Sequence, residues 1–235
     1  LGATQAAPAR AWLDVGGDGP QSRAAMRAPK LMLIRGDGQD GTLFPLDRRE
    51  VSLGRHKCDI LFPDDPAISP RHCTFHVTDG RVHVRDDGST NGVFLRIHTP
   101  TALTDNQIFL CGEQVFRFER FRPVPVTIGV DGAVFGGTPI SPWRFRVVQI
   151  PAGGHTGLAF CARKRSRTIG REDCDINFYQ DPYISHYHAR LEERGGQYVL
   201  TDLDSRNGTF VRIQEQALLE PGDHVFVGRQ LMRLE

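Results

Sequence analysis

One sequence unit occurs twice in this chain, and the duplication constrains the fold more than any other feature. The segment GRHKCDILFPDDPAISPRH begins at Gly54 and GREDCDINFYQDPYISHYH begins at Gly170, an offset of 170 − 54 = 116 residues. The same offset continues without a gap to Glu119 and Glu235, and about 24 of the 66 aligned positions are identical. A duplicated unit sets the domain count more firmly than a length of 235 residues does. The sequence therefore predicts two similar domains.

Each copy has the pattern of short β-strands joined by tight turns. Alternating apolar runs flank Asp79-Gly80 in CTFHVTDGRVHV and Gly195-Gly196 in ARLEERGGQYVL, where both turn residues can take the positive φ that a hairpin requires. Further strands are expected at KLMLIRG, TLFPL and REVSLGR in copy one, and at WRFRVVQI, GLAFCAR and RTIGR in copy two. No stretch of ten residues shows a helical stripe. The prediction is an all-β chain of two consecutive antiparallel β-sandwiches.

The segments between and before the copies set the expected boundaries. Residues 1–29 are rich in Ala, Gly, Pro and Arg and are expected to be disordered, and residues 30–120 form the first domain. Residues 121–142 carry four prolines and four glycines, which is typical of a linker, and residues 143–235 form the second domain. A flexible linker of this length spans roughly 25 Å, which would permit bivalent binding. The chain does not begin with Met, which leaves open a processed form or a piece of a longer protein.

Composition narrows the functional classes. The chain has 29 basic and 28 acidic side chains, so no overall field draws it to nucleic acid or to an anionic membrane. No window approaches the roughly 18 apolar residues of a membrane span. The five cysteines form no CxxC pair and are odd in number, which favours a reducing, cytoplasmic location. We expect no cofactor and no metal, and we expect binding neither to nucleic acid nor to a membrane. The oligomeric state stays open.

Several polar residues in the predicted connections of copy one recur at the same positions of copy two. Arg55, Ser69 and Asn91 lie in three separate connections of copy one, and they recur as Arg171, Ser185 and Asn207 in copy two. The ordered set GR, then IS-x-x-H, then S-x-NG followed by an aromatic and a basic residue resembles the forkhead-associated (FHA) family. The resemblance covers nearly the whole of each copy.

The resemblance implies a non-catalytic β-sandwich that binds phosphothreonine peptides through the loops at one end. By position, Arg55 and Ser69 would contact the phosphate, Asn91 would hold the peptide backbone and Thr90 would flank the phosphothreonine. Copy two would use the corresponding Arg171, Ser185 and Asn207. A guanidinium gives planar, charge-assisted hydrogen bonds to phosphate oxygens, each contributing on the order of 1.5–3 kcal/mol.

The two copies differ around these residues. Ser69 is followed by Pro70 and Arg71, a second basic side chain, whereas Ser185 is followed by His186 and Tyr187, and Arg206 stands at the position of Thr90. We expect Arg71, His186 and Arg206 to take part in peptide binding. The resemblance assigns a bracing role in the loops to His72, Gly92, His188 and Gly208. Copy one is therefore the better candidate for ordinary phosphothreonine binding.

Three functional classes remain to be weighed. The first is an adaptor that binds phosphothreonine-containing proteins, which would be Ser/Thr kinase substrates or the kinase itself. The second is a structural assembly module that binds partners independently of phosphorylation. An enzyme is disfavoured, because the repeat contains no paired carboxylates and no nucleophile with a positioned base. Zinc binding at His186 and His188, redox chemistry at Cys58 or Cys174 and nucleic-acid binding at the basic run 163–167 are weaker readings.

Overall fold

The structure, a computed structural model, describes residues 28–36, 38–122, 125–137 and 143–235. Within these ranges it contains strands and no helix, which confirms the all-β fold class. The first copy provides β1 (Lys30–Ile34), β2 (Asp40–Pro45), β3 (Glu50–Gly54), β4 (Ile60–Leu61), β5 (Cys73–Thr78), β6 (Arg81–Asp86), β7 (Val93–Arg96), β8 (Thr101–Leu103), β9 (Ile108–Cys111) and β10 (Gln114–Arg120). The second copy provides β11 (Phe145–Gln149), β12 (Ala159–Ala162), β13 (Ser166–Gly170), β14 (Ile176–Asn177), β15 (Ala189–Arg194), β16 (Gln197–Asp202), β17 (Thr209–Arg212), β18 (Gln216–Leu219), β19 (His224–Val227) and β20 (Gln230–Leu234).

The predicted hairpin turns are present with the expected backbone. Asp79 and Gly80 have φ of 50° and 76°, and they join β5 to β6; Gly195 and Gly196 have φ of 55° and 81°, and they join β15 to β16. Two successive positive φ values match the right-handed twist of the flanking strands. In β6 the side chains of Val82 and Val84 are buried while their neighbours face outward, as a two-residue period requires.

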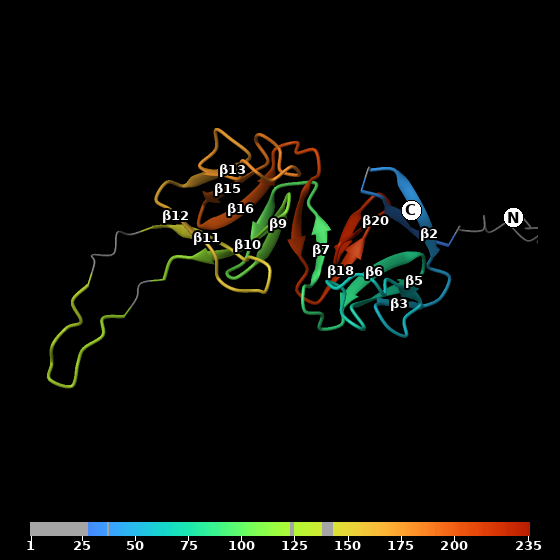
Figure 1. Cartoon of the computed structure of the whole chain (residues 1–235), viewed down its shortest axis with the longest axis horizontal. Helices are drawn as coiled ribbons and strands as arrows, with labels where there is room; N and C mark the ends of the chain where they lie inside the picture. The colour runs from blue at the N-terminus through green and yellow to red at the C-terminus, as the bar shows by residue number, and fades with distance from the viewer. Residues whose placement is uncertain (1–27, 37, 123–124, 138–142) are drawn as a thin grey trace, which may run out of the picture.

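The strands form three sheets that make two sandwiches (Figure 1). One ten-stranded sheet, in the order β12-β11-β10-β9-β17-β7-β19-β20-β1-β2, runs through the whole molecule. The five-stranded sheet β18-β6-β5-β3-β4 packs on one half of it, and β14-β13-β15-β16-β8 packs on the other. Pairing is antiparallel except for the short parallel pairs β3–β4 and β13–β14.

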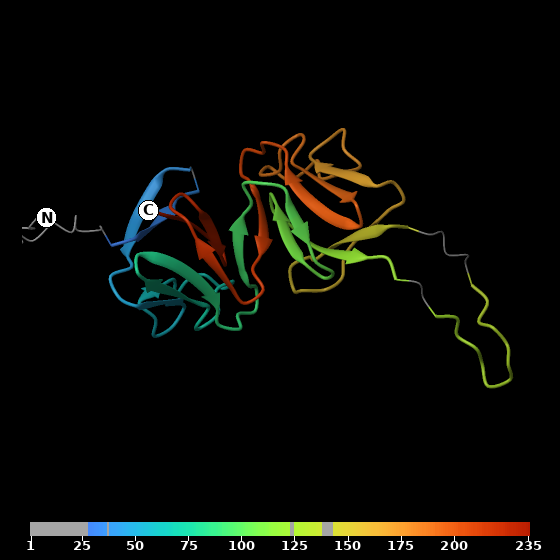
Figure 2. The same ribbon diagram turned by 180° about the vertical axis from the view of Figure 1, so that it is seen from behind.

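The two sandwiches do not coincide with the two sequence copies, because the copies exchange their last three strands. The sandwich that we call the first unit contains β1–β7 from copy one and β18–β20 from copy two. The second unit contains β11–β17 from copy two and β8–β10 from copy one. The exchange occurs in the segments 97–100 and 213–215, which cross between the units instead of turning back (Figure 2). It is a strand exchange within one chain, comparable to domain swapping between identical protomers.

Both cores depend on this exchange. In the first unit Leu31, Phe75 and Val84 pack with Val225 and Met232, all fully buried. Five side chains of β18–β20 are buried there, and each such burial contributes about 1.5–3 kcal/mol. The fully buried core of the second unit combines copy-one and copy-two residues in the same way, as in the set Phe109, Phe116, Phe118, Phe145, Ile169 and Leu191. Neither copy alone supplies a complete core in this arrangement.

The segment predicted as a linker is a long hairpin loop of the second unit. Strands β10 and β11, which flank it, pair directly, with Phe116 opposite Gln149 and Arg120 opposite Phe145. Within the loop, Ile128 and Val134 form an isolated antiparallel bridge, and the loop projects from the body of the molecule (Figure 1). Residues 123–124 and 138–142 of this segment, and residues 1–27 of the expected disordered segment, lie outside the described residues. The spacing between the units is therefore set by the continuous sheet rather than by a flexible tether.

Candidate functional site

Arg55 lies directly beside Ser69 at one end of the first unit. It follows β3, and its backbone N–H donates to the carbonyl of Ser69 at 3.1 Å. Its side-chain Nε donates to the carbonyl of Ile68 at 2.6 Å, which holds the partly buried guanidinium against the loop. The remaining guanidinium nitrogens make no hydrogen bond to any other described residue. The side chain is therefore positioned while two of its nitrogens stay available to an anion.

Ser69 links its own loop to the turn between β6 and β7. Its hydroxyl accepts a hydrogen bond from the backbone N–H of Thr90 at 3.1 Å. In the same turn the exposed Asn91 donates from Nδ2 to the carbonyl of Ala67 at 2.8 Å. Arg55, Ser69, Thr90 and Asn91, which are predicted from separate connections, are thus brought to one place.

The bracing role predicted for His72 has a direct structural basis. The buried ring accepts a hydrogen bond at Nδ1 from the backbone N–H of Ser69, at 3.1 Å. Nδ1 therefore carries no proton, and Nε2 donates to the carbonyl of Gly92 at 3.1 Å. Burial, only partly offset by the Gly92 carbonyl and nearby carboxylates, lowers the pKa of His72 and keeps the ring neutral. One imidazole therefore ties the serine loop to the asparagine turn.

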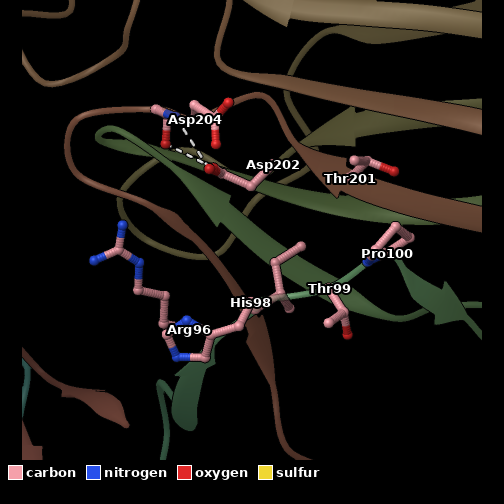
Figure 3. Close-up of a pocket in the computed structure, with 9 residues that line it drawn as sticks. Arg96, His98, Thr99, Pro100, Thr201, Asp202 and Asp204 are labelled. Carbon is pink, nitrogen blue, oxygen red and sulfur yellow. Dashed lines mark hydrogen bonds between the residues drawn. The ribbon is translucent and has the colours of Figure 1, made fainter. Parts of the chain in front are cut away.

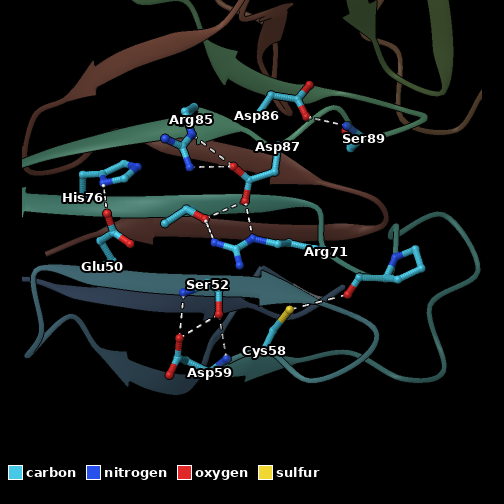
Figure 4. Close-up of polar contacts among 12 residues, drawn as sticks. Glu50, Ser52, Cys58, Asp59, Arg71, His76, Arg85, Asp86, Asp87 and Ser89 are labelled. Carbon is cyan, nitrogen blue, oxygen red and sulfur yellow. Dashed lines mark hydrogen bonds and ion pairs between the residues drawn. The ribbon is translucent and has the colours of Figure 1, made fainter.

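Arg71, which precedes His72 in the chain, has hydrogen-bond partners of its own (Figure 4). Its Nε donates to Asp87 at 2.9 Å and its Nη2 donates to Thr74 at 3.1 Å. Arg85 forms an ion pair with the other oxygen of Asp87 at 3.1 Å, so one carboxylate sits between two guanidinium groups. Burial raises the pKa of Asp87, but the hydrogen bonds from Thr74 and from the two guanidinium groups together outweigh burial and lower it. The cluster of Arg71, Arg85 and Asp87 therefore keeps one net positive charge.

The second unit repeats the backbone contact of the arginine and the contacts of the serine, asparagine and histidine side chains. The Arg171 backbone donates to Ser185, Ser185 Oγ accepts from the backbone of Arg206 at 3.0 Å, and Asn207 Nδ2 donates to the carbonyl of Tyr183 at 2.7 Å. The buried His188 accepts from the backbone of Ser185 at Nδ1 and contacts the carbonyl of Gly208 through Nε2, at 3.0 and 3.1 Å. Burial lowers the pKa of His188 as it does that of His72.

The two sites differ in the charge and size of their exposed surroundings. The exposed pair His56 and Lys57 of the first unit is replaced by Glu172 and Asp173 in the second. His186 contacts both of these carboxylates, through Nδ1 to Glu172 at 3.1 Å and Nε2 to Asp173 at 3.5 Å. Three exposed tyrosines lie on the same loop in the second unit, at the positions of a proline, an alanine and an arginine in the first: Tyr179, Tyr183 and Tyr187. The second site is therefore more acidic and more aromatic.

A feature of the site that the sequence interpretation did not identify is the contribution of the other copy. The loop before Ser69 is held by the buried Asp65, which accepts from the backbone of Arg229 at 2.9 Å and from Gln230 Nε2 at 2.8 Å. Its counterpart Asp181 accepts from the backbone of Glu113 and from Gln114 Nε2, at 2.9 and 2.8 Å. Asp65/Asp181 and Gln114/Gln230 recur at the repeat offset, which was the available clue to their role.

The geometry around the histidines and cysteines bears on the alternative zinc and redox readings. Among the described residues no group of three or more His, Cys, Asp or Glu side chains could hold a metal ion. Burial raises the pKa of the Cys58 and Cys174 thiols, which lowers the fraction present as the reactive thiolate. In the described part of the chain no helix is long and apolar enough to cross a membrane.

Two β-sandwiches that each bring an arginine, a serine and an asparagine together at one end define a class of loop-based binding modules. A family model, FHA domain, matches residues 51–112 and 167–228, and the chain belongs to the FHA family. Over 108 residues it is 32% identical to the glycogen accumulation regulator GarA of Mycolicibacterium smegmatis, covering 45% of this chain and 67% of that protein. Over 111 residues it is 30% identical to the oxoglutarate dehydrogenase inhibitor of Corynebacterium glutamicum, covering 46% and 74%. A solved FHA domain of protein CT664 from Chlamydia trachomatis covers 88% of this chain and 95% of its own, with 14% identity and a TM-score of 0.35.

Proposed function

We propose that the chain is an adaptor in Ser/Thr kinase signalling that binds phosphothreonine peptides through its two FHA units. The observation that carries the proposal is that each unit brings an arginine, a serine hydroxyl and an asparagine amide together at one end, with the guanidinium of Arg55 held against the loop in the first unit. A phosphorylated side chain offers about two negative charges and three acceptor oxygens, which suit an arginine next to backbone N–H groups. The partners would be proteins phosphorylated on threonine, either kinase substrates or the kinase itself.

The proposal includes the roles assigned by position. Arg55 and Ser69, and Arg171 and Ser185, would contact the phosphate, and Asn91 and Asn207 would hold the peptide backbone. Arg71 would add charge to the first site, and Arg206, which stands at the position of Thr90, would do so at the second. His186 would line the second site beside its two carboxylates. These roles require no reaction, and both named relatives are described as a regulator or an inhibitor.

A titration tests this function. A degenerate pool of phosphothreonine peptides should bind the intact chain, while the matched threonine pool should bind at least about tenfold more weakly, since the charge-assisted bonds to phosphate are lost. Arg55→Ala and Arg171→Ala should each remove one of two binding events. Equal binding of the two pools, together with unchanged partner binding by the double variant, would refute the adaptor.

A phosphorylation-independent assembly role is the second candidate, and one observation favours it. The projecting loop exposes a series of apolar side chains, with Val126, Ile128, Val134 and Phe135 between 62% and 80% exposed. Exposed apolar side chains gathered on one segment are typical of protein contact surfaces. Replacing Ile128 and Phe135 by Ser should then weaken partner capture without changing binding of the peptide pool. For either role we propose that the chain is located in the cytoplasm.

A further inference from the structure

The strand exchange places an arginine of each copy against the binding turn of the other copy. Arg212, at the end of β17, lies over Gly92, the glycine that follows Asn91 in the first unit. A Cβ on Gly92 would lie 2.6 Å from Cζ of Arg212, so the guanidinium occupies the space that any other residue at position 92 would need. Arg96 of β7 lies in the same way over Gly208, where a Cβ would lie 2.9 Å from its Cζ.

This contact exists because β7 and β17 pair at the centre of the ten-stranded sheet. Arg212 is opposite Phe94 in the antiparallel register, and the backbone N–H of Ile213 donates to the carbonyl of Val93 at 2.9 Å. The side chain of Arg212 therefore reaches the residue that precedes β7. If the strands of each copy folded back on their own copy, β17 would not lie next to β7 and Arg212 would have no access to Gly92.

From Arg212 a continuous set of polar contacts leads into the turn. Its Nη2 forms an ion pair with Asp86 at 3.7 Å, and Asp86 is almost completely buried. Asp86 accepts from the backbone N–H of Ser89 at 2.8 Å, and the buried hydroxyl of Ser89 accepts from the N–H of Gly92 at 2.9 Å. Thr90 and Asn91, the residues proposed to contact the peptide, lie between Ser89 and Gly92, whose backbone N–H groups are held by these hydrogen bonds.

In the second unit Arg96 lies over Gly208 in the same way but, among the described residues, without an ion pair to the corresponding aspartate. Asp202, the counterpart of Asp86, is bonded to the hydroxyls of Ser205 and Thr209, each at 2.6 Å. Among the described residues it forms no ion pair with Arg96, which instead lines a cavity of about 360 Å³ together with His98 and Asp204 (Figure 3). In this view Arg96 and His98 lie on one side of the cavity, and Asp202 and Asp204 on the other. Arg96 is therefore held mainly by its contact with Gly208.

We infer that Arg212 and Arg96 are positioning residues that act across the copies: Arg212 orders the phosphopeptide-binding turn of the first unit and Arg96 orders that of the second. The inference rests on the proposed function of the two turns. Neither arginine is placed at the phosphate itself. Each acts through a glycine turn whose geometry decides where the asparagine and its neighbour lie, and a turn ordered before binding costs less to fix in the complex.

Crossed variants test this inference. Arg171→Ala leaves only the first site, and Arg55→Ala leaves only the second, with the phosphothreonine peptide pool as the probe. In the Arg171→Ala protein, Arg212→Ala should weaken binding about three- to tenfold, while Arg96→Ala should not. In the Arg55→Ala protein the effects should be reversed, with a smaller loss from Arg96→Ala because that side chain lacks the carboxylate. Arg212→Lys should recover part of the loss, and Arg163→Ala, at an exposed position, is the control.

Hydrogen exchange gives a readout that does not depend on peptide binding. In Arg212→Ala the N–H groups of Thr90 and Gly92 should exchange faster, while those of Arg206 and Gly208 keep their rates. If Arg212→Ala instead affected the second site, or altered neither peptide binding nor exchange at the first, the inference would be overturned. If the intact chain did not distinguish the phosphorylated pool, the proposed function would fail, and the exchange rates would still decide whether Arg212 orders the turn.

Discussion

Leu95 and Val211 are opposite each other in the central pair of strands, and they are the same position of the two copies, since 211 − 95 = 116. The molecule therefore has an approximate twofold relationship whose axis passes between these two residues. On either side, β7 pairs with β19 and β17 pairs with β9, so every neighbour of the central pair comes from the other copy. Phe94, Phe210 and Leu110 form a small apolar cluster on this part of the sheet.

Cutting the projecting loop distinguishes exchanged from consecutive domains. A protease site inserted between Asp131 and Gly132 would divide the chain into two pieces, each of which supplies strands to both cores. We expect the cleaved protein to elute at the size of the intact chain under native conditions and to separate only in denaturant. Two pieces that separate at micromolar concentration without denaturant would show that each copy folds alone.

Cross-linking tests the same arrangement at the level of one strand pair. His83 and Leu218 are opposite each other in β6 and β18, and both face away from the core. The double variant His83→Cys/Leu218→Cys should form a disulfide, because opposed residues of antiparallel strands lie within its Cα range of about 4.4–6.8 Å. Val199→Cys/Leu218→Cys is the matched control: it would cross-link only if β18 returned to its own copy. Mass spectrometry of the cleaved, non-reduced protein separates the two outcomes.

Gly92→Ala should destabilise the first unit for two separable reasons. Gly92 has φ of 82°, which disfavours a side chain, and the added methyl would meet Arg212. Gly88→Ala is a matched control, because Gly88 has φ of 79° but no atom within 4 Å of an added Cβ. We expect Gly88→Ala to lower the free energy of unfolding by about 1 kcal/mol and Gly92→Ala by clearly more. Urea unfolding measures both; equal losses would mean that Arg212 moves aside freely.

Stability should fall when the pH is lowered through the ordinary pKa of histidine. His72 and His188 have lowered pKa values in the folded protein, first because of burial, so below pH about 6.5 the unfolded chain binds more protons than the folded one. The free energy of unfolding should be level between about pH 7 and 8 and decline from there towards pH 5. His72→Asn should weaken this dependence. Urea midpoints at pH 7.5 and 5.5 provide the comparison.

The two sites should prefer peptides of opposite flanking charge. His56 and Lys57 in the first site correspond to Glu172 and Asp173 in the second, and arginines of a peptide could also lie over the exposed tyrosines there. We expect the Arg171→Ala protein to select acidic flanks and the Arg55→Ala protein to select basic flanks, by a few-fold and less at high salt. Replacing Glu172 and Asp173 by His and Lys should shift the second preference towards the first. Identical selection by both proteins would contradict this expectation.

The strands and the hairpin turns were predictable because they depend on local patterns. Alternation of apolar residues defines β6, and Asp79-Gly80 defines its turn whichever copy completes the sheet. Ser69 and Asn91 could be assigned to one site through the family resemblance, since they lie in loops at the same end of the sandwich.

The exchange of β8–β10 with β18–β20 was not predictable, because the copies carry equivalent strands. Leu103 and Leu219 are identical at the repeat offset, so either one satisfies the same core position. The chain crosses between the units in the segments 97–100 and 213–215, and the β7–β17 pair joins the two copies at the centre of the sheet. The prolines and glycines of residues 121–142 suit a loop as well as a linker, which is why their composition did not reveal the pairing of β10 with β11.

The continuous sheet also bears on how such a gene can change. In a chain of separate modules, recombination can remove or replace one module and leave its neighbour intact. Here the removal of either copy would take strands out of both sandwiches, so neither half of the gene could be lost without disrupting both. A substitution at Arg212 in the second half would change the surroundings of Gly92 in the first. Loss of either half would therefore disrupt both sandwiches, even though the surfaces around their binding turns differ.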